Sequence, residues 1–190
     1  MICYLVRHGQ DDETRRGGWS ENPLTEEGIR QAEVLADKMC GLAIGSVYSS
    51  DLRRAMQTAK VLADKLHLPV VPLPQFREVN NGDLAGMKNS LALEQYPGLF
   101  WNQLDWEQRY PNGESPKQFY ERIRTAWTAF TEEILSQGKD VMLVTHGGVI
   151  HVIRAILENR QYSNQEIHKK VGCTETIALS CRNGVWEELR

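Results

Sequence analysis

The stretch "CYLVRHGQDDETRRGGW", residues 3–19, changes character within a few positions. Its first four residues are apolar and predict a buried strand over residues 2–6, but Arg7, His8 and Gly9 follow at once. By itself this pattern fits a strand that surfaces into a charged turn. A second apolar run, "DVMLVTHGG" at 140–148, also ends on a histidine followed by glycine. The recurrence indicates that two histidines follow strand ends, so the edge of the sheet where both strands end is a candidate site.

The rest of the chain alternates strands and helices. Apolar residues recur at helical spacing over about 26–39, 52–66, 116–135 and 149–159, with Thr25 as an N-cap and Ser115 and Gln118 as a capping box. Strands are predicted at 2–6, 46–50, 68–73 and 140–145, and residues 176–189 form two more around an Asn-Gly turn. This order predicts an α/β fold: a three-layer αβα arrangement whose mostly parallel central sheet is covered on both faces.

Residues 81–114 fit no single period, and we expect them to form a lid or a small helical excursion. No repeat or linker interrupts the pattern, so residues 1–190 are predicted to form a single domain. Aromatic side chains in the lid could cover a ring-bearing group or pack the lid onto the body. They are Tyr96, Phe100, Trp101, Trp106 and Tyr110.

Bulk composition restricts the partners. The net charge of −3 lacks the basic balance that nucleic acid or an anionic membrane favours, although local arginines could bind a small anion. The four cysteines include no C-x-x-C pair. Cys173 and Cys181 could form a disulfide, but their spacing in the sequence does not show whether they do. We see no secretory leader or membrane-length apolar run and expect a cytoplasmic protein; the oligomeric state stays open.

Three strand ends are rich in cations. Arg7 and His8 follow the first strand, His146 follows the "VMLVT" strand, and Arg53 and Arg54 come shortly after residues 46–50. Ligands of open α/β sheets bind at the carboxyl ends of strands, where these side chains converge if the strands are parallel neighbours. Cations gathered in this way need an anion between them, and guanidinium forks suit phosphate oxygens. Glycine-rich nucleotide fingerprints are absent from the sequence, so the predicted phosphate pocket has no such cradle.

Five segments resemble the histidine phosphatase superfamily, the phosphoglycerate-mutase-like family. They occur in the family's order and span most of the chain. The segments are "LVRHG" (5–9), "PLTEEGIRQA" (23–32), "YSSDLRRAMQTA" (48–59), "FREVNNGDLAG" (76–86) and "VTHGGVI" (144–150). The resemblance implies a phosphoglycerate-mutase-like fold, and it implies a small phosphatase, since the longer insertion of the family's mutases is missing after the acid segment.

The resemblance also implies a role for each matching residue. His8 is the nucleophile that forms a phosphohistidine, and Arg7 and Arg54 bind phosphate oxygens. His146 stabilises the charge on the transferring phosphoryl group. Glu78 protonates the leaving oxygen and then activates water. Because the first step needs neutral His8 and protonated Glu78, we expect the rate to peak at mildly acidic to neutral pH. Arg53 is expected to face solvent.

The first loop departs from the family pattern. The family continues the histidine motif with Glu and then Thr or Ser, and has Asn at the position of Thr14. Gln10 keeps hydrogen bonding without charge, and the Thr14 hydroxyl is predicted to donate weakly to phosphate. Asp11 would repel phosphate unless it pairs with Arg15 or Arg16 or meets a cationic substrate group. We predict that Asp11 influences substrate choice.

Further positions are assigned to the pocket. Gly147 is predicted to contact phosphate, and Trp19 to influence specificity. Glu114, in the "NGES" loop, either lines the pocket or caps the following helix. Glu78 has an alternative interpretation as a salt-bridge partner of Arg77.

The predicted reaction is metal-independent hydrolysis of a small phosphorylated metabolite without a cofactor. The identity of the substrate stays open among α-ribazole phosphate, sugar phosphates, phosphoserine and nucleotides. The alternatives are a mutase-type phosphoryl transferase and a catalytically weak binding protein of the same fold. A zinc site built from His8, His146 and a cysteine is disfavoured, because Cys3 lies at the wrong end of its strand.

Overall fold

Within residues 1–166 and 168–189, which the computed structural model describes, the strands form a six-stranded sheet in the order β3-β2-β4-β1-β5-β6. The pairs β1–β4, β2–β4 and β2–β3 are parallel, whereas β1–β5 and β5–β6 are antiparallel. The predicted mostly parallel sheet is confirmed, with β3 at one edge. The strands are β1 (Ile2–Arg7), β2 (Ile44–Ser49), β3 (Val70–Pro72), β4 (Asp140–Thr145), β5 (Thr176–Arg182) and β6 (Val185–Glu188).

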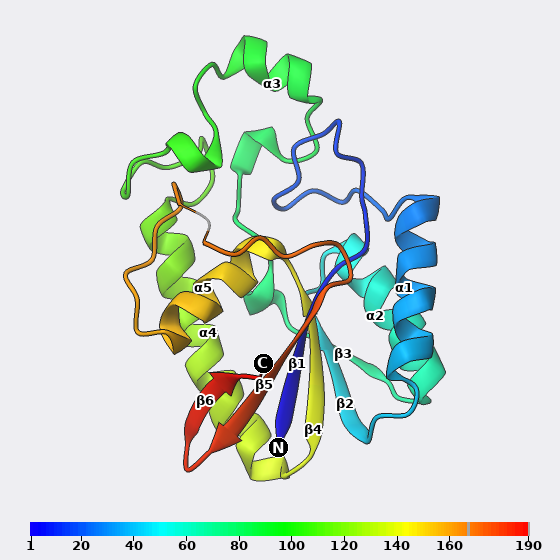
Figure 1. The fold of residues 1–190 in the computed structure, drawn as a ribbon. Helices are drawn as coiled ribbons and strands as arrows, with labels where there is room; N and C mark the ends of the chain where they lie inside the picture. Colours follow the sequence, from blue (N-terminus) through cyan, green and yellow to red (C-terminus); the bar gives the residue numbers. More distant parts are fainter. Residues whose placement is uncertain (167, 190) are drawn as a thin grey trace.

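Helices α1 and α2 cover one face of the sheet, and α4 and α5 cover the other (Figure 1). The α-helices are α1 (Glu26–Met39), α2 (Arg53–Leu66), α3 (Asn89–Gln95), α4 (Pro116–Gln137) and α5 (Gly147–Leu157). Both predicted N-caps are present. The Thr25 hydroxyl accepts from the Gly28 N–H at 3.0 Å, and the Ser115 hydroxyl accepts from the Gln118 N–H at 3.2 Å.

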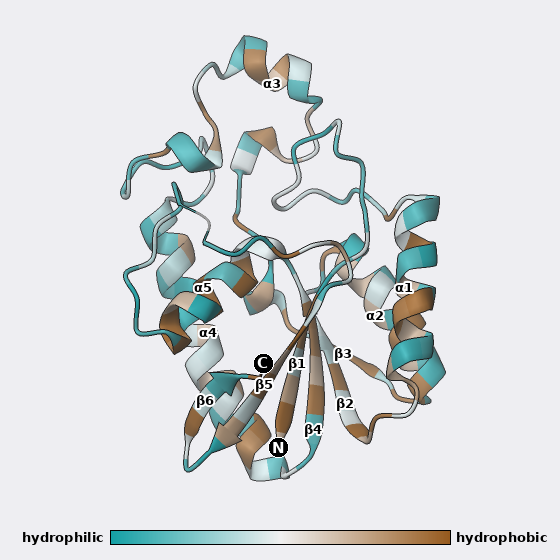
Figure 2. Ribbon diagram, in the orientation of Figure 1, coloured by the Kyte–Doolittle hydropathy of each residue, from teal (hydrophilic) through white to brown (hydrophobic). Residues whose placement is uncertain are grey.

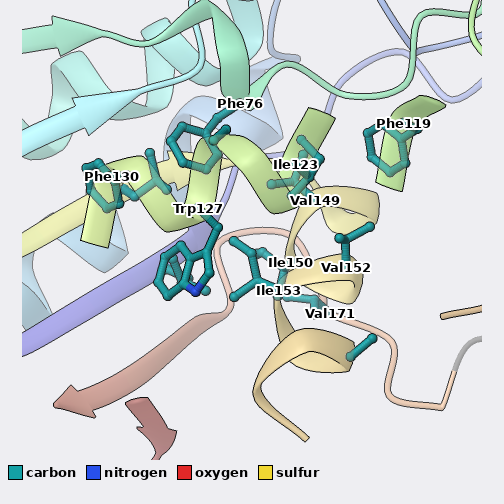
Figure 3. Packing of buried hydrophobic residues seen from close by; sticks show 14 of the residues in the cluster. Phe76, Phe119, Ile123, Trp127, Phe130, Val149, Ile150, Val152, Ile153 and Val171 are labelled. Atoms are coloured by element: carbon teal, nitrogen blue, oxygen red, sulfur yellow. The ribbon is translucent and has the colours of Figure 1, made fainter. Parts of the chain in front are cut away.

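Alternate residues of the central strands face opposite hydrophobic cores. Leu5 packs into the core beneath α4 and α5, whereas its neighbour Val6 packs into the core beneath α1 and α2. Figure 2 shows apolar residues along β1 and β4, as burial on both faces requires. The apolar stripe of α4 meets α5 in the larger core, where Ile123 and Trp127 lie beside Val149 and Ile150, and Phe130 packs against Phe76 (Figure 3).

The predicted C-terminal strand pair is also confirmed. The turn residues Asn183 and Gly184 have φ values of 52° and 80°, which is the left-handed conformation that an Asn-Gly hairpin turn requires. The pair adds two antiparallel strands beside β1, and β1 therefore lies inside the sheet between β4 and β5.

The lid segment 81–114 lies beyond the carboxyl ends of the strands, with α3 farthest from the sheet (Figure 1). It is mostly loop and 3-10 turn, including Gly82–Leu84 and Trp101–Gln103; a further 3-10 turn, Pro74–Phe76, precedes it. The Trp101 ring packs edge-on against Phe119 with centroids 5.4 Å apart, and Tyr110 is buried beside it. Trp101 and Tyr110 therefore pack the lid onto the body, as one of the two interpretations expected, and Trp101 also lines the cavity described below.

Two smaller findings concern the cysteines and the possibility of a membrane-spanning helix. Cys3, Cys40, Cys173 and Cys181 are all free thiols, so Cys173 and Cys181 are not paired. Among the described helices, none combines the length and the apolarity needed to cross a bilayer.

Candidate active site

The register of β1 and β4 brings two distant histidines together. Arg7 pairs with Thr145 at the carboxyl ends of these parallel strands, so the next residue of each strand is a histidine. The His8 N–H donates to the Thr145 carbonyl at 3.0 Å. The rings of His8 and His146 lie with centroids 5.0 Å apart and planes inclined by 60°. The two imidazoles therefore occupy one neighbourhood at the sheet edge.

The ring of His8 is held in one orientation by its own loop. Nδ1 lies 2.7 Å from the Gly9 carbonyl oxygen, which can only accept, so Nδ1 carries the proton. The opposite nitrogen, Nε2, then has a free lone pair, and it accepts a hydrogen bond from Arg54 Nε at 3.2 Å. Burial, with the charge of Arg54 adding to it, lowers the pKa of His8 to about 3. His8 is consequently neutral at physiological pH.

His146 is completely buried, at 0% exposure, and lies behind His8. Its Nε2 lies 2.8 Å from the Ser50 hydroxyl, and that hydroxyl already accepts from the Leu52 N–H at 3.4 Å. Nδ1 of His146 is buried without a partner among the described residues. Burial and the nearby Arg54 guanidinium hold the pKa of His146 well below its usual range. This ring is a neutral group with one nitrogen unused.

Arg7 and Arg54 approach from different elements. Arg7 Nη1 donates to the Val171 carbonyl at 2.6 Å, while its Nε is buried without a partner in the described part of the chain. Arg54, in the first turn of α2, is 2% exposed and donates to the carbonyls of Gly18 and Ser20 at 2.8 and 3.2 Å. Its neighbour Arg53 is exposed, as predicted.

Glu78 lies opposite the helix that follows His146. Its Oε2 accepts from the Gly148 N–H at 3.1 Å, and its Oε1 accepts from the Val79 N–H at 3.1 Å. The alternative interpretation of Glu78 as a partner of Arg77 is wrong, because the Arg77 fork binds both oxygens of Asp51 at 2.6 and 2.5 Å.

A cavity of about 380 Å³ opens over these groups. Its floor contains Arg7, His8, Glu78, Gly147 and Gly148. Arg54 and His146 do not line it and stand one layer deeper, in contact with His8. The two imidazoles, two guanidiniums and one carboxylate of the predicted cluster therefore lie together, with Arg7, His8 and Glu78 at the cavity surface and Arg54 and His146 beneath it.

Two residues of the first loop that were assigned to the site, Thr14 and Asp11, lie outside the cavity lining. The exposed Thr14 hydroxyl donates to Asp12 Oδ1 at 2.6 Å and does not line the cavity, so the prediction that it donates to phosphate is not supported. Asp11 pairs with neither Arg15 nor Arg16. Its Oδ2 lies 3.4 Å from Arg54 Nε, on the same N–H that faces His8. The Arg54 guanidinium offsets the repulsion between the Asp11 carboxylate and a bound phosphate. A role of Asp11 in substrate choice stays a prediction.

Glu114 and Trp19 also lie outside the cavity lining. Glu114 neither lines the pocket nor caps α4, because its carboxylate binds the Arg122 fork at 2.7 and 2.9 Å. Trp19 Nε1 donates to the Glu78 carbonyl at 2.7 Å. Both residues contact the segment that bears Glu78, instead of the space a substrate would fill.

Several residues around the site were not predicted from the sequence. Ser50 orients His146, and Arg122 contacts the backbone of Glu78. Ser50 is part of the segment "YSSDLRRAMQTA", and its position next to a strand end was the feature of the sequence that could have indicated a place in the site. Arg122 lies on the polar side of α4, and its position in the sequence indicates no contact with Glu78. The outer wall of the cavity also includes Tyr162, Lys169 and Lys170, which come from an irregular segment.

Comparison with known proteins agrees with this geometry. The sheet and its two helix layers have the phosphoglycerate-mutase-like α/β fold, shared with solved structures. The native structure of a mycobacterial glucosyl-3-phosphoglycerate phosphatase matches with a TM-score of 0.81 and 28% identity, covering 98% of this chain and 96% of that one. A putative alpha-ribazole-5′-P phosphatase from Escherichia coli str. K-12 substr. MG1655 matches with a TM-score of 0.85 and 26% identity, covering 100% and 94%.

The sequence comparison is more specific. The model of the histidine phosphatase superfamily (branch 1) matches residues 3–190. The probable phosphoglycerate mutase GpmB of Yersinia pestis (strain Pestoides F) is 39% identical over 153 residues, which are 77% of this chain and 70% of that protein. This chain belongs to the histidine phosphatase superfamily, branch 1, and the prediction of a phosphatase of that superfamily is confirmed.

Proposed function

We propose that this protein hydrolyses small organic phosphomonoesters through a phosphohistidine on His8, without a metal ion. The observation that carries the proposal is the tautomer of His8. Its Nδ1 proton is fixed on the Gly9 carbonyl, so the lone pair of Nε2 points toward Arg54 and the cluster of cations. A neutral imidazole with a directed lone pair is a nucleophile, and the guanidiniums supply the positive charge that phosphoryl transfer requires.

In the free protein, the Arg54 Nε–H donates a hydrogen bond to His8 Nε2. In the proposed first step, this N–H donates to a phosphate oxygen instead, which frees the Nε2 lone pair. Nε2 then attacks phosphorus, the P–N bond forms, and the P–O bond to the leaving group breaks. The Glu78 carboxyl gives its proton to the leaving oxygen, which departs as an alcohol. Arg7, Arg54 and His146 stabilise the charge on the equatorial oxygens, because they are fixed in place before the reaction begins.

In the second step, Glu78 is a carboxylate and removes a proton from a water molecule. That water attacks phosphorus, the P–N bond breaks, and Nε2 regains its lone pair. Inorganic phosphate leaves, and the proton now on Glu78 restores the starting state. The N-terminal turn of α5, which begins at Gly147, adds its helix dipole beside the phosphate position.

The outer half of the cavity supports a leaving group of moderate size. Trp101, Tyr162 and Val171 provide ring and aliphatic surface, while Lys169 and Lys170 provide positive charge. We infer a phosphorylated metabolite with a ring or a further polar group as the substrate class. A library of phosphate esters, assayed for phosphate release in EDTA, identifies the preferred member. Turnover lost on chelation, or turnover retained when His8 is replaced by alanine, contradicts the proposal.

A second candidate function is phosphoryl transfer of the mutase type, favoured by the 39% identity to the probable phosphoglycerate mutase. The two functions differ in the acceptor, which is water in one and a second hydroxyl in the other. Incubation with 3-phosphoglycerate and a trace of 2,3-bisphosphoglycerate separates them. We expect inorganic phosphate to be released from the ester library with no isomerisation faster than hydrolysis, whereas rapid isomerisation would assign the mutase.

The contact between Gly148 and Glu78 gives a prediction. A Cβ at position 148 would lie 2.3 Å from Glu78 Oε1, so Gly148→Ala must displace the proposed acid. We expect kcat/KM to fall by about 10-fold or more, which is part of the 10²–10⁴-fold contribution of a general acid. The matched control is Gly41→Ala, because no atom lies within 4 Å of its added Cβ. Equal activity of the two variants would show that Glu78 is not positioned here for catalysis.

The buried His8 also predicts how stability depends on pH. Its pKa is about 3 in the folded protein, against an ordinary value of 6.5, so the unfolded chain binds the proton more readily between these values. Stability contributed by neutral His8 is therefore present above pH 6.5 and is lost as pH falls, by up to about 1.4 kcal/mol per pH unit. Urea unfolding at pH 7 and pH 5 measures this loss. The variant His8→Asn should lose less stability on acidification, and an identical loss would contradict the assignment.

A further inference from the structure

The backbone carbonyl of Glu78 is held by two side chains that do not line the cavity. Trp19 Nε1 donates to it at 2.7 Å, and Arg122 Nη2 donates to it at 3.1 Å. Trp19 comes from the first loop and Arg122 from α4, so the carbonyl is fixed from two independent directions. A carbonyl oxygen with both lone pairs engaged leaves its peptide little freedom to rotate.

Arg122 does more than contact this one carbonyl. Its Nη1 donates to the carbonyls of Gln75 and Arg77 at 2.9 and 3.0 Å, so a single guanidinium spans the segment 75–78. Its Nε and Nη2 bind the carboxylate of Glu114 at 2.7 and 2.9 Å, with both side chains mostly buried. The carboxylate neutralises the guanidinium and fixes the plane of the fork, as bidentate pairs do.

The residues flanking Glu78 are held by the same set. Glu114 accepts from the Asn80 N–H at 2.9 Å, and its own N–H donates to the Asn80 carbonyl at 2.8 Å. On the other side, the Arg77 guanidinium lies 4.8 Å above the Trp19 ring. Glu78, which lines the cavity together with Val79, therefore stands in a segment whose backbone is fixed on both sides of it.

We propose that Trp19, Arg122 and Glu114 are positioning residues that hold the Glu78 carboxyl against the leaving oxygen of the substrate. The inference rests on the proposed role of Glu78 as the proton donor. It also gives a function to Trp19 and Glu114, which the sequence placed near the pocket and the structure places behind the acid.

The proposal has a consequence that a purely structural role lacks. Misplacing a general acid harms esters whose leaving group needs a proton and spares those whose leaving group departs as a stable anion. A variant that merely unfolds part of the sample reduces the active fraction and lowers the rate for every ester equally. The ratio of kcat/KM values for two esters therefore separates the two roles, because kcat/KM includes only the steps up to phosphohistidine formation.

The experiment compares phenyl phosphate, which has the poorer leaving group, with 4-nitrophenyl phosphate. The variants are Trp19→Phe, which removes one donor and keeps a ring beneath Arg77, and Arg122→Met combined with Glu114→Gln, which removes both buried charges together. We expect kcat/KM for phenyl phosphate to fall about 10-fold further than for 4-nitrophenyl phosphate in each. Equal losses for the two esters would overturn the proposal.

Two controls complete the test. Trp106→Phe makes the same chemical change at a tryptophan that is 41% exposed and should leave the ratio unchanged. Glu78→Gln should show the largest leaving-group dependence of all. If Glu78→Gln lowers both esters equally, the proposed acid role itself fails, and the positioning role fails with it. If Glu78→Gln shows the dependence and the Trp19 and Arg122 variants do not, the positioning role alone is overturned.

Discussion

Replacing His8 by alanine should abolish phosphate release from every ester that the protein hydrolyses. The substitution removes the Nε2 lone pair that is proposed to attack phosphorus. His151 also lines the cavity, with its Nε2 3.2 Å from the Ser163 carbonyl oxygen. His146 is fully buried with Nε2 engaged by Ser50, and it does not line the cavity. Loss of a nucleophile that works together with its neighbours costs about 10⁴-fold or more in kcat. Steady-state phosphate release, measured with the best ester of the library, checks this.

His67→Asn is the matched control for that experiment. His67 is exposed at the end of α2 with φ at 56°, a conformation that asparagine tolerates. We expect this variant to have the activity of the unmodified protein. Residual activity of His8→Ala within about 10-fold of the unmodified protein would mean that another group attacks phosphorus.

Replacing Arg54 by methionine should have the second largest effect. Arg54 donates to His8 Nε2, to the carbonyls of Gly18 and Ser20, and lies beside Asp11, so it connects the nucleophile to the first loop. Removing one fixed cation from a developing charge costs about 10²–10³-fold in catalysis. The variant also leaves the half-buried Asp11 without its partner, and phosphate binding should weaken further through repulsion. Values of kcat/KM and the inhibition constant of inorganic phosphate measure both effects.

The adjacent Arg53 provides a direct comparison. It has the same side chain one position earlier in α2, but it is exposed. Arg53→Met should therefore change kcat/KM by less than about 3-fold, as expected for a solvent-facing charge. Similar losses in the two variants would show that overall positive charge, and not a bound guanidinium, accounts for the effect.

Much of the fold could be predicted from local signals. The caps at Thr25 and Ser115 and the Asn183-Gly184 turn are decided by short-range chemistry, and all three are present. The meeting of His8 and His146 could also be predicted, because parallel strands that end at the same register place their next residues side by side. In each case the relevant contact follows from neighbouring residues or from one rule about sheets.

The remaining parts depend on contacts between distant segments. For Asp11, the sequence suggested Arg15, Arg16 or a cationic substrate group as the partner. Asp11 instead pairs with Arg54 from α2, because the first loop folds back over that helix. The contact of Arg122 with the Glu78 carbonyl joins residues 44 positions apart. The sequence of an amphipathic helix does not indicate which distant segment a polar residue contacts, so these contacts could be identified only from the structure.

In the proposed mechanism, Nε2 of His8 carries the phosphoryl group during turnover. The most direct measurement is to mix the protein with a ³²P-labelled ester, quench in alkali within one turnover, and locate the label by peptide mass spectrometry. We expect a label that survives alkali, is lost in acid, and lies on the peptide containing His8. A label on His146 or another residue, or hydrolysis in a single step with no labelled protein under any quench time, would contradict this mechanism.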